Sequence, residues 1–327
     1  MRRWLGSVAV AAGLAGPAWG QATGQVPEAS SVEVKVEVNV RPGPGVVGDV
    51  QQRADPDFDP TVVRPAYRRA RPRVLFDEGH ANFHTSEGRY RPFARLVAND
   101  GYAVTPVRER FGPGVLAKGD ILVVANAMST GPAGSAITPG EADAVRDWVG
   151  EGGSLLLIAD RAPFGVGSQL LADRFGVEMS LAQTGDPANS LWHPANLLFS
   201  RENRLLGDHP ILRGRDESER VGRVLTFAGQ SLRGPEGSVA LLKLGEGAYD
   251  AALTGGATTP AAGRSQGLAF PHGKGRVVVL GEAAVLSAQT IGAERLGMNV
   301  PGSDDRQFAL NIMHWLSGLL EPEAGSR

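Results

Sequence analysis

The spacing of apolar positions along the chain predicts strands that alternate with helices from residue 73 to residue 320. Strands are expected where short, β-rich apolar runs occur, at 74–76, 102–107, 121–125, 154–159 and 275–282. Helices are expected where apolar residues recur three or four positions apart, at 90–99, 138–149, 167–175 and 304–316. This alternation predicts an α/β fold with a doubly wound, mainly parallel sheet of the flavodoxin type.

The helix expected at 138–149 has the clearest local signals. Thr138 is a good N-cap residue, Pro139 fits the first helical position, and Glu141 stands three residues after the cap. Gly152 and Gly153 then end the helix. By contrast, the segment 177–266 is rich in loops and has only short β-like runs, such as 223–227 and 238–242. We expect these runs to form an antiparallel extension of the sheet.

The first 22 residues have the order of a secretory signal peptide. Arg2 and Arg3 precede an apolar run at 4–14, and small residues follow as far as Gly20. We expect cleavage near Gly20–Ala22 and a periplasmic or secreted protein. Residues 23–72 are rich in proline, glycine, valine and charge and are predicted to be a flexible linker, and 321–327 a disordered tail.

Composition narrows the classes of function. The chain has 33 basic and 35 acidic residues, so nothing in its charge indicates a nucleic-acid partner. No segment after the leader is long and apolar enough to predict a membrane span. The chain has no cysteine, which excludes disulfides and a thiol nucleophile.

Candidate chemistry lies just after the predicted strands. Parallel strands end on the same side of a sheet, so the residues that follow them should share one edge, where doubly wound domains bind ligands. The candidate catalytic residues at this edge are Asp77, Glu78, His80, Asp160 and Glu282. The candidate ligand-binding residues there are Asn82, His84 and Arg161, and Asn126 should lie beside them. The alternative is a purely structural edge, in which these side chains cap the backbone and Asp160 pairs with Arg161.

The sequence allows two further predictions, a metal site and a second ligand-binding loop. No motif indicates a cofactor, but His80, His84 and Asp77 could hold a divalent metal, although the two histidines lack the glutamate of a zincin helix. The loop before the last helix and the first turn of that helix offer Asn299, Asp304, Asp305 and Gln307 as further ligand-binding candidates. Its alternative role is capping of the helix by Ser303 or Asp304. Trp192, in the middle region, could stack on a sugar or simply lie at the surface.

The order of these elements resembles the class I glutamine amidotransferase-like superfamily, and more narrowly exported domains of the DUF4350 type. The resemblance covers residues 72–318 and is carried by a helix-strand unit that matches at Thr138, Pro139, Glu141, Ala144, Trp148, Val149, Gly152, Gly153, Leu155, Leu156, Leu157, Ile158, Ala159 and Asp160. The superfamily places a nucleophilic cysteine after a central strand, where this chain has Asp160-Arg161. The resemblance therefore implies the fold and the site edge, but not thiol-based glutamine hydrolysis.

The resulting hypothesis is an exported amidotransferase-like domain over residues 73–320. It would bind a small polar ligand or glycan at the strand edge without thiol chemistry. One alternative is a periplasmic hydrolase in which a divalent metal activates water. The other is a partner-binding scaffold that docks through the valine-alternating stretch at 32–38.

Overall fold

A computed structural model describes residues 52–69, 71–129 and 134–320. The predicted signal peptide, the alternating stretch at 32–38 and the predicted tail at 321–327 lie outside the described residues. None of the helices in the described part has the length and apolar character that crossing a membrane requires.

Within the described residues, the main sheet has nine strands, and five of them are parallel. Along the sheet the parallel strands are β3 (Ala103–Val107), β2 (Arg73–Asp77), β4 (Ile121–Ala125), β5 (Ser154–Ile158) and β15 (Gly275–Leu280). The chain reaches β3 by moving outward from β2 and then returns past β2 to β4, so the strand order reverses between β2 and β4. The predicted doubly wound, mainly parallel sheet is confirmed, and its switch point lies between these two strands.

The antiparallel extension is confirmed for one of the two runs named for it. The sheet continues from β15 through strands that run antiparallel to their neighbours: β14 (Ser265–His272), β10 (Leu232–Arg233) and β6 (Glu178–Met179), with β11 (Val239–Lys243) also pairing with β14. The run at 223–227 was wrongly expected in this sheet. It forms β9 (Arg223–Leu225), which pairs with β8 (Leu198–Ser200), because the backbone of β9 is held by two aspartates at the start of the last helix.

Besides the β8–β9 pair, the described residues form two three-stranded sheets outside the main one. The first contains β13 (Thr259–Pro260), β12 (Tyr249–Ala251) and β7 (Gln183–Gly185). The second contains β1 (Arg53–Ala54), β16 (Ala288–Ile291) and β17 (Glu294–Gly297). Short 3₁₀ turns occur at Pro187–Asn189, Glu217–Glu219 and Ala284–Leu286.

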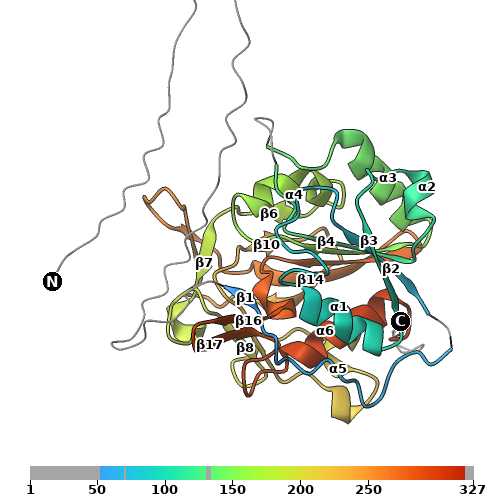
Figure 1. The fold of residues 1–327 in the computed structure, drawn as a ribbon. Coiled ribbons are helices and arrows are strands. Elements are labelled where there is room, and N and C mark those ends of the chain that lie inside the picture. The colour runs from blue at the N-terminus through green and yellow to red at the C-terminus, as the bar shows by residue number, and fades with distance from the viewer. Residues whose placement is uncertain (1–51, 70, 130–133, 321–327) are drawn as a thin grey trace, which may run out of the picture. The chain divides into compact units, whose positions relative to one another are not determined.

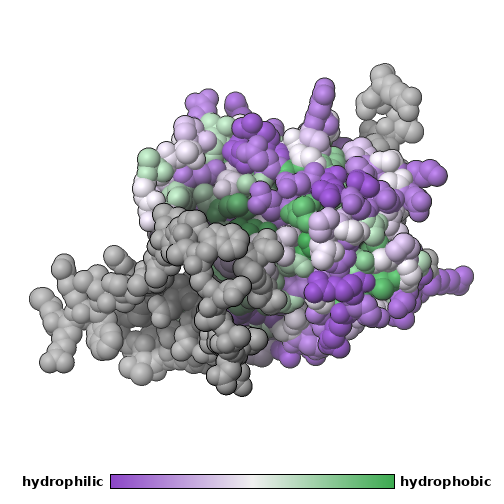
Figure 2. Space-filling view, turned by 90° about the horizontal axis from the view of Figure 1, so that it is seen from above, coloured by the Kyte–Doolittle hydropathy of each residue, from purple (hydrophilic) through white to green (hydrophobic). Residues whose placement is uncertain are grey.

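Helices cover both faces of the main sheet (Figure 1). One face carries α1 (Arg91–Asn99) and α6 (Asp305–Leu316), with the short α5 (Pro210–Arg213) beside α6, and the other carries α2 (Pro113–Leu116), α3 (Pro139–Gly150) and α4 (Phe164–Asp173). Side chains alternate between two core clusters along each strand, as the period of a strand requires. Val74 and Phe76 pack toward Phe308 of α6, while Leu75 packs into the cluster that contains Val145 of α3. Seen from the side of α2 to α4, hydrophilic residues surround small apolar patches (Figure 2).

The capping box of α3 is present as predicted. The Thr138 side chain accepts a hydrogen bond from the Glu141 N–H, and the Glu141 carboxylate accepts one from the Thr138 N–H. The expected termini of α4 differ slightly, since this helix begins at Phe164 rather than Gly167.

Residues 53–67, which the sequence assigned to the linker, make specific contacts with the α/β body. β1 pairs with β16, and the Ala66 N–H donates to Asp100 Oδ1 at 2.7 Å. The Tyr67 hydroxyl donates to Ser317 Oγ at 3.0 Å, just after α6. This segment is called the N-terminal strap (residues 52–69) below.

Candidate functional site

The residues expected on one edge do lie on one edge. Asp77 is the last residue of β2, Asn126 follows β4 directly, and Asp160 and Glu282 stand two residues after β5 and β15, which are neighbours in the sheet. Hydrogen bonds connect them along the edge. Phe83 N–H donates to Asn126 O at 2.9 Å, and the Asn126 amide donates to Asp160 Oδ2 at 2.8 Å. This edge, which begins at the switch point between β2 and β4, is called the rim (Asp77, His80, Asn82, Asn126, Asp160, Arg161, Glu282).

A buried histidine connects the rim to the start of α3. His80 Nδ1 lies 2.8 Å from Asp77 Oδ1, and His80 Nε2 lies 3.0 Å from Glu141 Oε1. Burial alone would lower the pKa of His80, but hydrogen bonds and charges from Asp77 and Glu141 outweigh it and raise this pKa. Both ring nitrogens are therefore engaged by carboxylates, and the ring is fixed.

Glu141 is a rim contact that the sequence prediction missed as a site residue. Its Oε2 accepts the Thr138 hydroxyl and N–H, and its Oε1 accepts the Phe111 N–H and faces His80. Burial would raise the pKa of Glu141, but these hydrogen bonds together lower it to about 2. The capping-box pattern identified Glu141 as a helix-start residue, but no local pattern indicates a partner 61 positions away.

Two other candidates beside His80 hold the loop after β2 in shape. The Asn82 amide donates to Asp77 Oδ2 at 2.9 Å. Glu78 Oε1 accepts both the N–H and the hydroxyl of Ser86, and Glu78 Oε2 accepts a hydrogen bond from Arg108 at 2.9 Å. Glu78 is thus fully occupied, whereas Asn82 stays partly exposed.

Asp160 and Glu282 form the acidic part of the rim. Asp160 is half-buried, and its Oδ1 accepts the Ala283 N–H at 2.9 Å. Glu282 is buried and accepts the N–H groups of Ala284 and Val285 at 2.6 and 2.8 Å. Burial and the nearby Asp160 charge raise the pKa of Glu282 well above its ordinary range, and burial also raises the pKa of Asp160. Both carboxyl groups therefore favour their protonated forms more than exposed carboxyl groups do.

Backbone strain gathers around the rim. Ala81, Asn126, Leu181 and Ala228 all have φ between +49° and +59°, a region that side chains other than glycine rarely adopt. Ala81 and Asn126 belong to the loops after β2 and β4. Leu181 accepts the Ala162 N–H at 3.1 Å, and Ala228 accepts a hydrogen bond from Arg161 at 3.1 Å, so both lie against the loop after β5. Strained backbone of this kind is concentrated at functional sites in other proteins.

The metal hypothesis has no support from the described residues. His84 is fully buried and stacks on Tyr90 with ring centroids 4.7 Å apart. Burial lowers its pKa to about 3, so the ring is neutral. His84 packs in the aromatic core while His80 is engaged by two carboxylates, and the described part of the chain contains no group of three acidic or histidine side chains that could hold an ion.

The predicted Asp160–Arg161 ion pair is absent from the described residues. Arg161 directs its guanidinium to the carbonyl of Ala228, and Asp160 is bonded to Asn126 and Ala283 instead. The reason is geometric, because Asp160 lies among the neighbouring strand ends while Arg161 reaches toward the segment before β10.

The second candidate loop is not part of the rim. Asp304 Oδ2 accepts the N–H groups of Gly222 and Arg223, and Asp305 Oδ1 accepts the Leu225 N–H at 3.0 Å. The expectation that Ser303 or Asp304 caps α6 is wrong, since no side-chain cap is present and the aspartates hold β9 instead. Burial raises the pKa of Asp305 to about 8. Asn299, also in this loop, donates a hydrogen bond to Asp55 Oδ2 of the strap at 2.8 Å.

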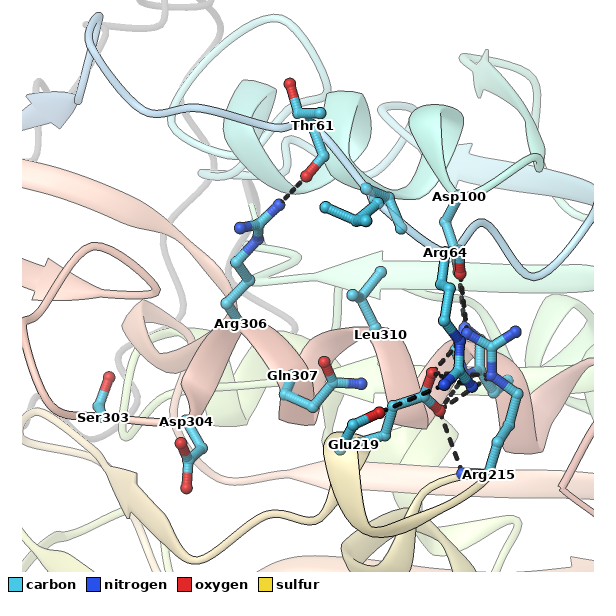
Figure 3. A pocket seen from close by; sticks show the side chains of 14 residues that line it. Thr61, Arg64, Asp100, Arg215, Glu219, Ser303, Asp304, Arg306, Gln307 and Leu310 are labelled. Carbon is cyan, nitrogen blue, oxygen red and sulfur yellow. Dashed lines mark hydrogen bonds and ion pairs between the residues drawn. The ribbon is translucent and has the colours of Figure 1, made fainter.

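Asp304 and Gln307 line a separate pocket along α6 (Figure 3). The pocket has a volume of about 430 Å³ and lies between α6, the strap residues 61–64 and the segment 215–219. Arg64 and Arg215 both pair with Glu219 at one end, and Arg306 donates to Thr61 O at the other. The pocket contains no rim residue, so the predicted ligand-binding residues divide between two places.

Comparison with known proteins places the fold. No protein-family model and no curated protein matches this sequence. Among solved structures, the N-terminal domain of mmIFT52 aligns with a TM-score of 0.54 at 15% identity, over 75% of this chain and 97% of that one. Cytoplasmic protein STM3548 from Salmonella typhimurium aligns with a TM-score of 0.46 at 10% identity, over 75% and 98% of the two chains. A protein described as ThuA-like from Bacteroides uniformis aligns with a TM-score of 0.41 at 10% identity, over 77% and 94%.

These likenesses concern the fold alone. The chain shares an α/β fold with the N-terminal domain of mmIFT52, and its sequence contains no cysteine.

Proposed function

We propose that this protein is an exported amidotransferase-like domain that binds a polar small molecule or glycan at the rim without thiol chemistry. The observation that carries the proposal is that four of the six non-glycine residues with positive φ in the described part, Ala81, Asn126, Leu181 and Ala228, lie in the loops of the rim or against them. Such strain lowers stability and persists where function maintains it.

The rim offers complementary groups to a polar ligand. Asp160 supplies acceptor oxygens and Arg161 supplies guanidinium donors, and both are partly exposed. Asn82 is also partly exposed, although its amide N–H groups donate to Asp77 Oδ2 and to the Ala125 carbonyl. Behind them, the Asp77–His80–Glu141 cluster and the backbone-bonded Glu282 are buried and fixed. A rigid support of this kind reduces the entropy lost when a ligand binds.

The experiment is a ligand screen on the mature protein by thermal shift, followed by calorimetry. The panel contains neutral oligosaccharides, peptidoglycan fragments and amino acids. We expect at least one compound to raise the melting temperature, and Asp160→Asn to weaken its binding about tenfold, because charge-assisted hydrogen bonds are lost.

Asp208→Asn is the matched control. Asp208 pairs with Arg213 on the surface, its side chain is 90% exposed, and it is not a rim residue, so this variant should bind normally. The proposal fails if no compound in the panel binds, or if Asp160→Asn and Asp208→Asn bind the ligand as tightly as the unchanged protein.

A further inference from the structure

Trp192 stands at the tip of a tight hairpin and is the most exposed aromatic side chain among the described residues. Its side chain is 80% exposed, and the other large apolar side chains exposed in the described part are Val63 and Leu253. Neither belongs to this hairpin, so the indole is isolated and does not form part of a broad apolar surface. Docking of a protein or a membrane normally uses a larger apolar patch.

The hairpin holds the indole out in a strained conformation. Trp192 has φ +61°, and the His193 N–H donates to Leu191 O at 2.7 Å, which closes a three-residue turn of the rare type with positive φ. Leu191 N–H donates to Asn196 O at 2.9 Å below the turn. Trp192 is therefore both exposed and held in a strained backbone conformation.

The base of the hairpin is connected to the rim. Ala228 N–H donates to Ala195 O at 2.9 Å, and Ala228 O accepts the Arg161 guanidinium at 3.1 Å. Two peptide groups thus connect the Trp192 hairpin with a predicted ligand-binding residue.

A buried acceptor lies at the same base. Asp186 N–H donates to Pro194 O at 2.9 Å, and the Asp186 side chain is only 1% exposed. Its Oδ2 accepts hydrogen bonds from Asn189 and Gly245, but its Oδ1 has no partner. Asp186 Oδ1 lies 3.9 Å from the position that a Cβ atom on Gly247 would occupy, and Gly247 is exposed.

We infer that Trp192 is a stacking platform for a sugar ring, so that the ligand of the rim is a carbohydrate. An isolated aromatic face beside hydrogen-bonding groups suits a ring that has an apolar face and a polar edge. Asn189, His193 and Asn196 lie within four residues of Trp192 in the sequence, and all three are at least partly exposed. This inference rests on the proposed function, since it names the class of ligand that the rim binds.

The test measures binding of three uncharged probes, cellotetraose, chitotetraose and maltotetraose, by calorimetry and by tryptophan fluorescence. We expect at least one probe to bind and to change the emission of the unchanged protein. Trp192→Gly should weaken that binding about tenfold, while Trp192→Phe should keep part of it. Trp192→Gly should keep or raise the melting temperature, because glycine accepts positive φ without strain.

Leu253→Ala is the matched control, since it shortens an exposed apolar side chain on another loop and should bind normally. The inference is overturned if Trp192→Gly binds the sugar as tightly as Leu253→Ala. If Asp160→Asn still weakens binding in that case, the proposed function stands and only the stacking role fails. If amino acids bind but none of the sugars does, the carbohydrate assignment is wrong, and if nothing binds, both proposals are wrong.

Discussion

At the scale of single residues, the buried histidines show how environment decides chemistry. His80 and His84 stand four positions apart in one loop, which made both candidates for one site. Hydrogen bonds and charges from two carboxylates raise the pKa of His80, whereas burial in the aromatic core lowers the pKa of His84. Sequence spacing identified the loop, but it could not indicate which ring would meet Asp77 and which would meet Tyr90.

Because folding raises the pKa of His80, the contribution of this residue to the free energy of unfolding depends on pH. A pKa raised on folding means that the native state binds the proton more tightly, so this contribution is fully present below the unfolded value of 6.5. It is lost as the pH rises from 6.5 through the higher folded value. We expect the difference in unfolding free energy between the unchanged protein and His80→Asn to shrink over that interval in urea titrations. A difference that is constant from pH 6 to pH 9 would contradict this account.

The lowered pKa of His84 gives the opposite behaviour. The unfolded chain binds a proton below pH 6.5, while the folded ring resists protonation until about pH 3, so this residue destabilises the fold progressively as the pH falls between those values. His84→Phe should keep the stacking on Tyr90 and remove the proton uptake. We expect the variant to gain stability relative to the unchanged protein between pH 6.5 and pH 4, measured by urea unfolding. Parallel stability curves for the two proteins would exclude this mechanism.

At the scale of elements, local sequence signals predicted where α3 begins, but they did not predict which short strands pair with each other. The start of α3 was predicted because Thr138, Pro139 and Glu141 act within one helical turn. The small sheets between residues 183 and 260 were not, because strands of two or three residues have too few positions to show a period. The wrong placement of 223–227 has the same origin, since Asp304 and Asp305 that hold β9 lie about 80 residues further along. The shared edge was predictable because parallel strands must end on one side.

Glu141 caps α3 and also contacts the rim residue His80, so its removal should lower stability more than removal of Thr138, the other capping residue. Thr138→Ala should cost about 1 kcal/mol, the usual effect of losing an N-cap side chain. Glu141→Ala removes the reciprocal cap and also leaves buried His80 Nε2 without a partner, which adds about 1–3 kcal/mol. Urea unfolding at pH 7 measures both. Equal losses for the two variants would show that the His80 contact adds nothing.

At the scale of the whole molecule, the fold positions a site without defining its chemistry. A doubly wound sheet collects the loops after its parallel strands at one edge, and here these loops bring together carboxylates, an amide and a guanidinium. The sheet, the two helical layers and the rim network need no cysteine, because they are held by apolar packing and by hydrogen bonds.

The unit that folds is expected to begin with the strap and not at residue 73. Phe58, Val62, Ala66 and Tyr67 pack against the core, and Asp100, which is fully buried, accepts the Ala66 N–H and also lies 2.7 Å from His314 Nε2. A chain that starts at residue 52 keeps these contacts, whereas one that starts at residue 68 leaves a buried carboxylate without one of its donors and exposes apolar surface. We expect the shorter chain to melt at least several degrees lower, since losses of about 1 kcal/mol shift the midpoint of a domain this large by about 2–4 °C and more than one contact is removed. Equal melting temperatures for the two chains, measured by circular dichroism, would show that the strap is only a linker, as the sequence composition suggested.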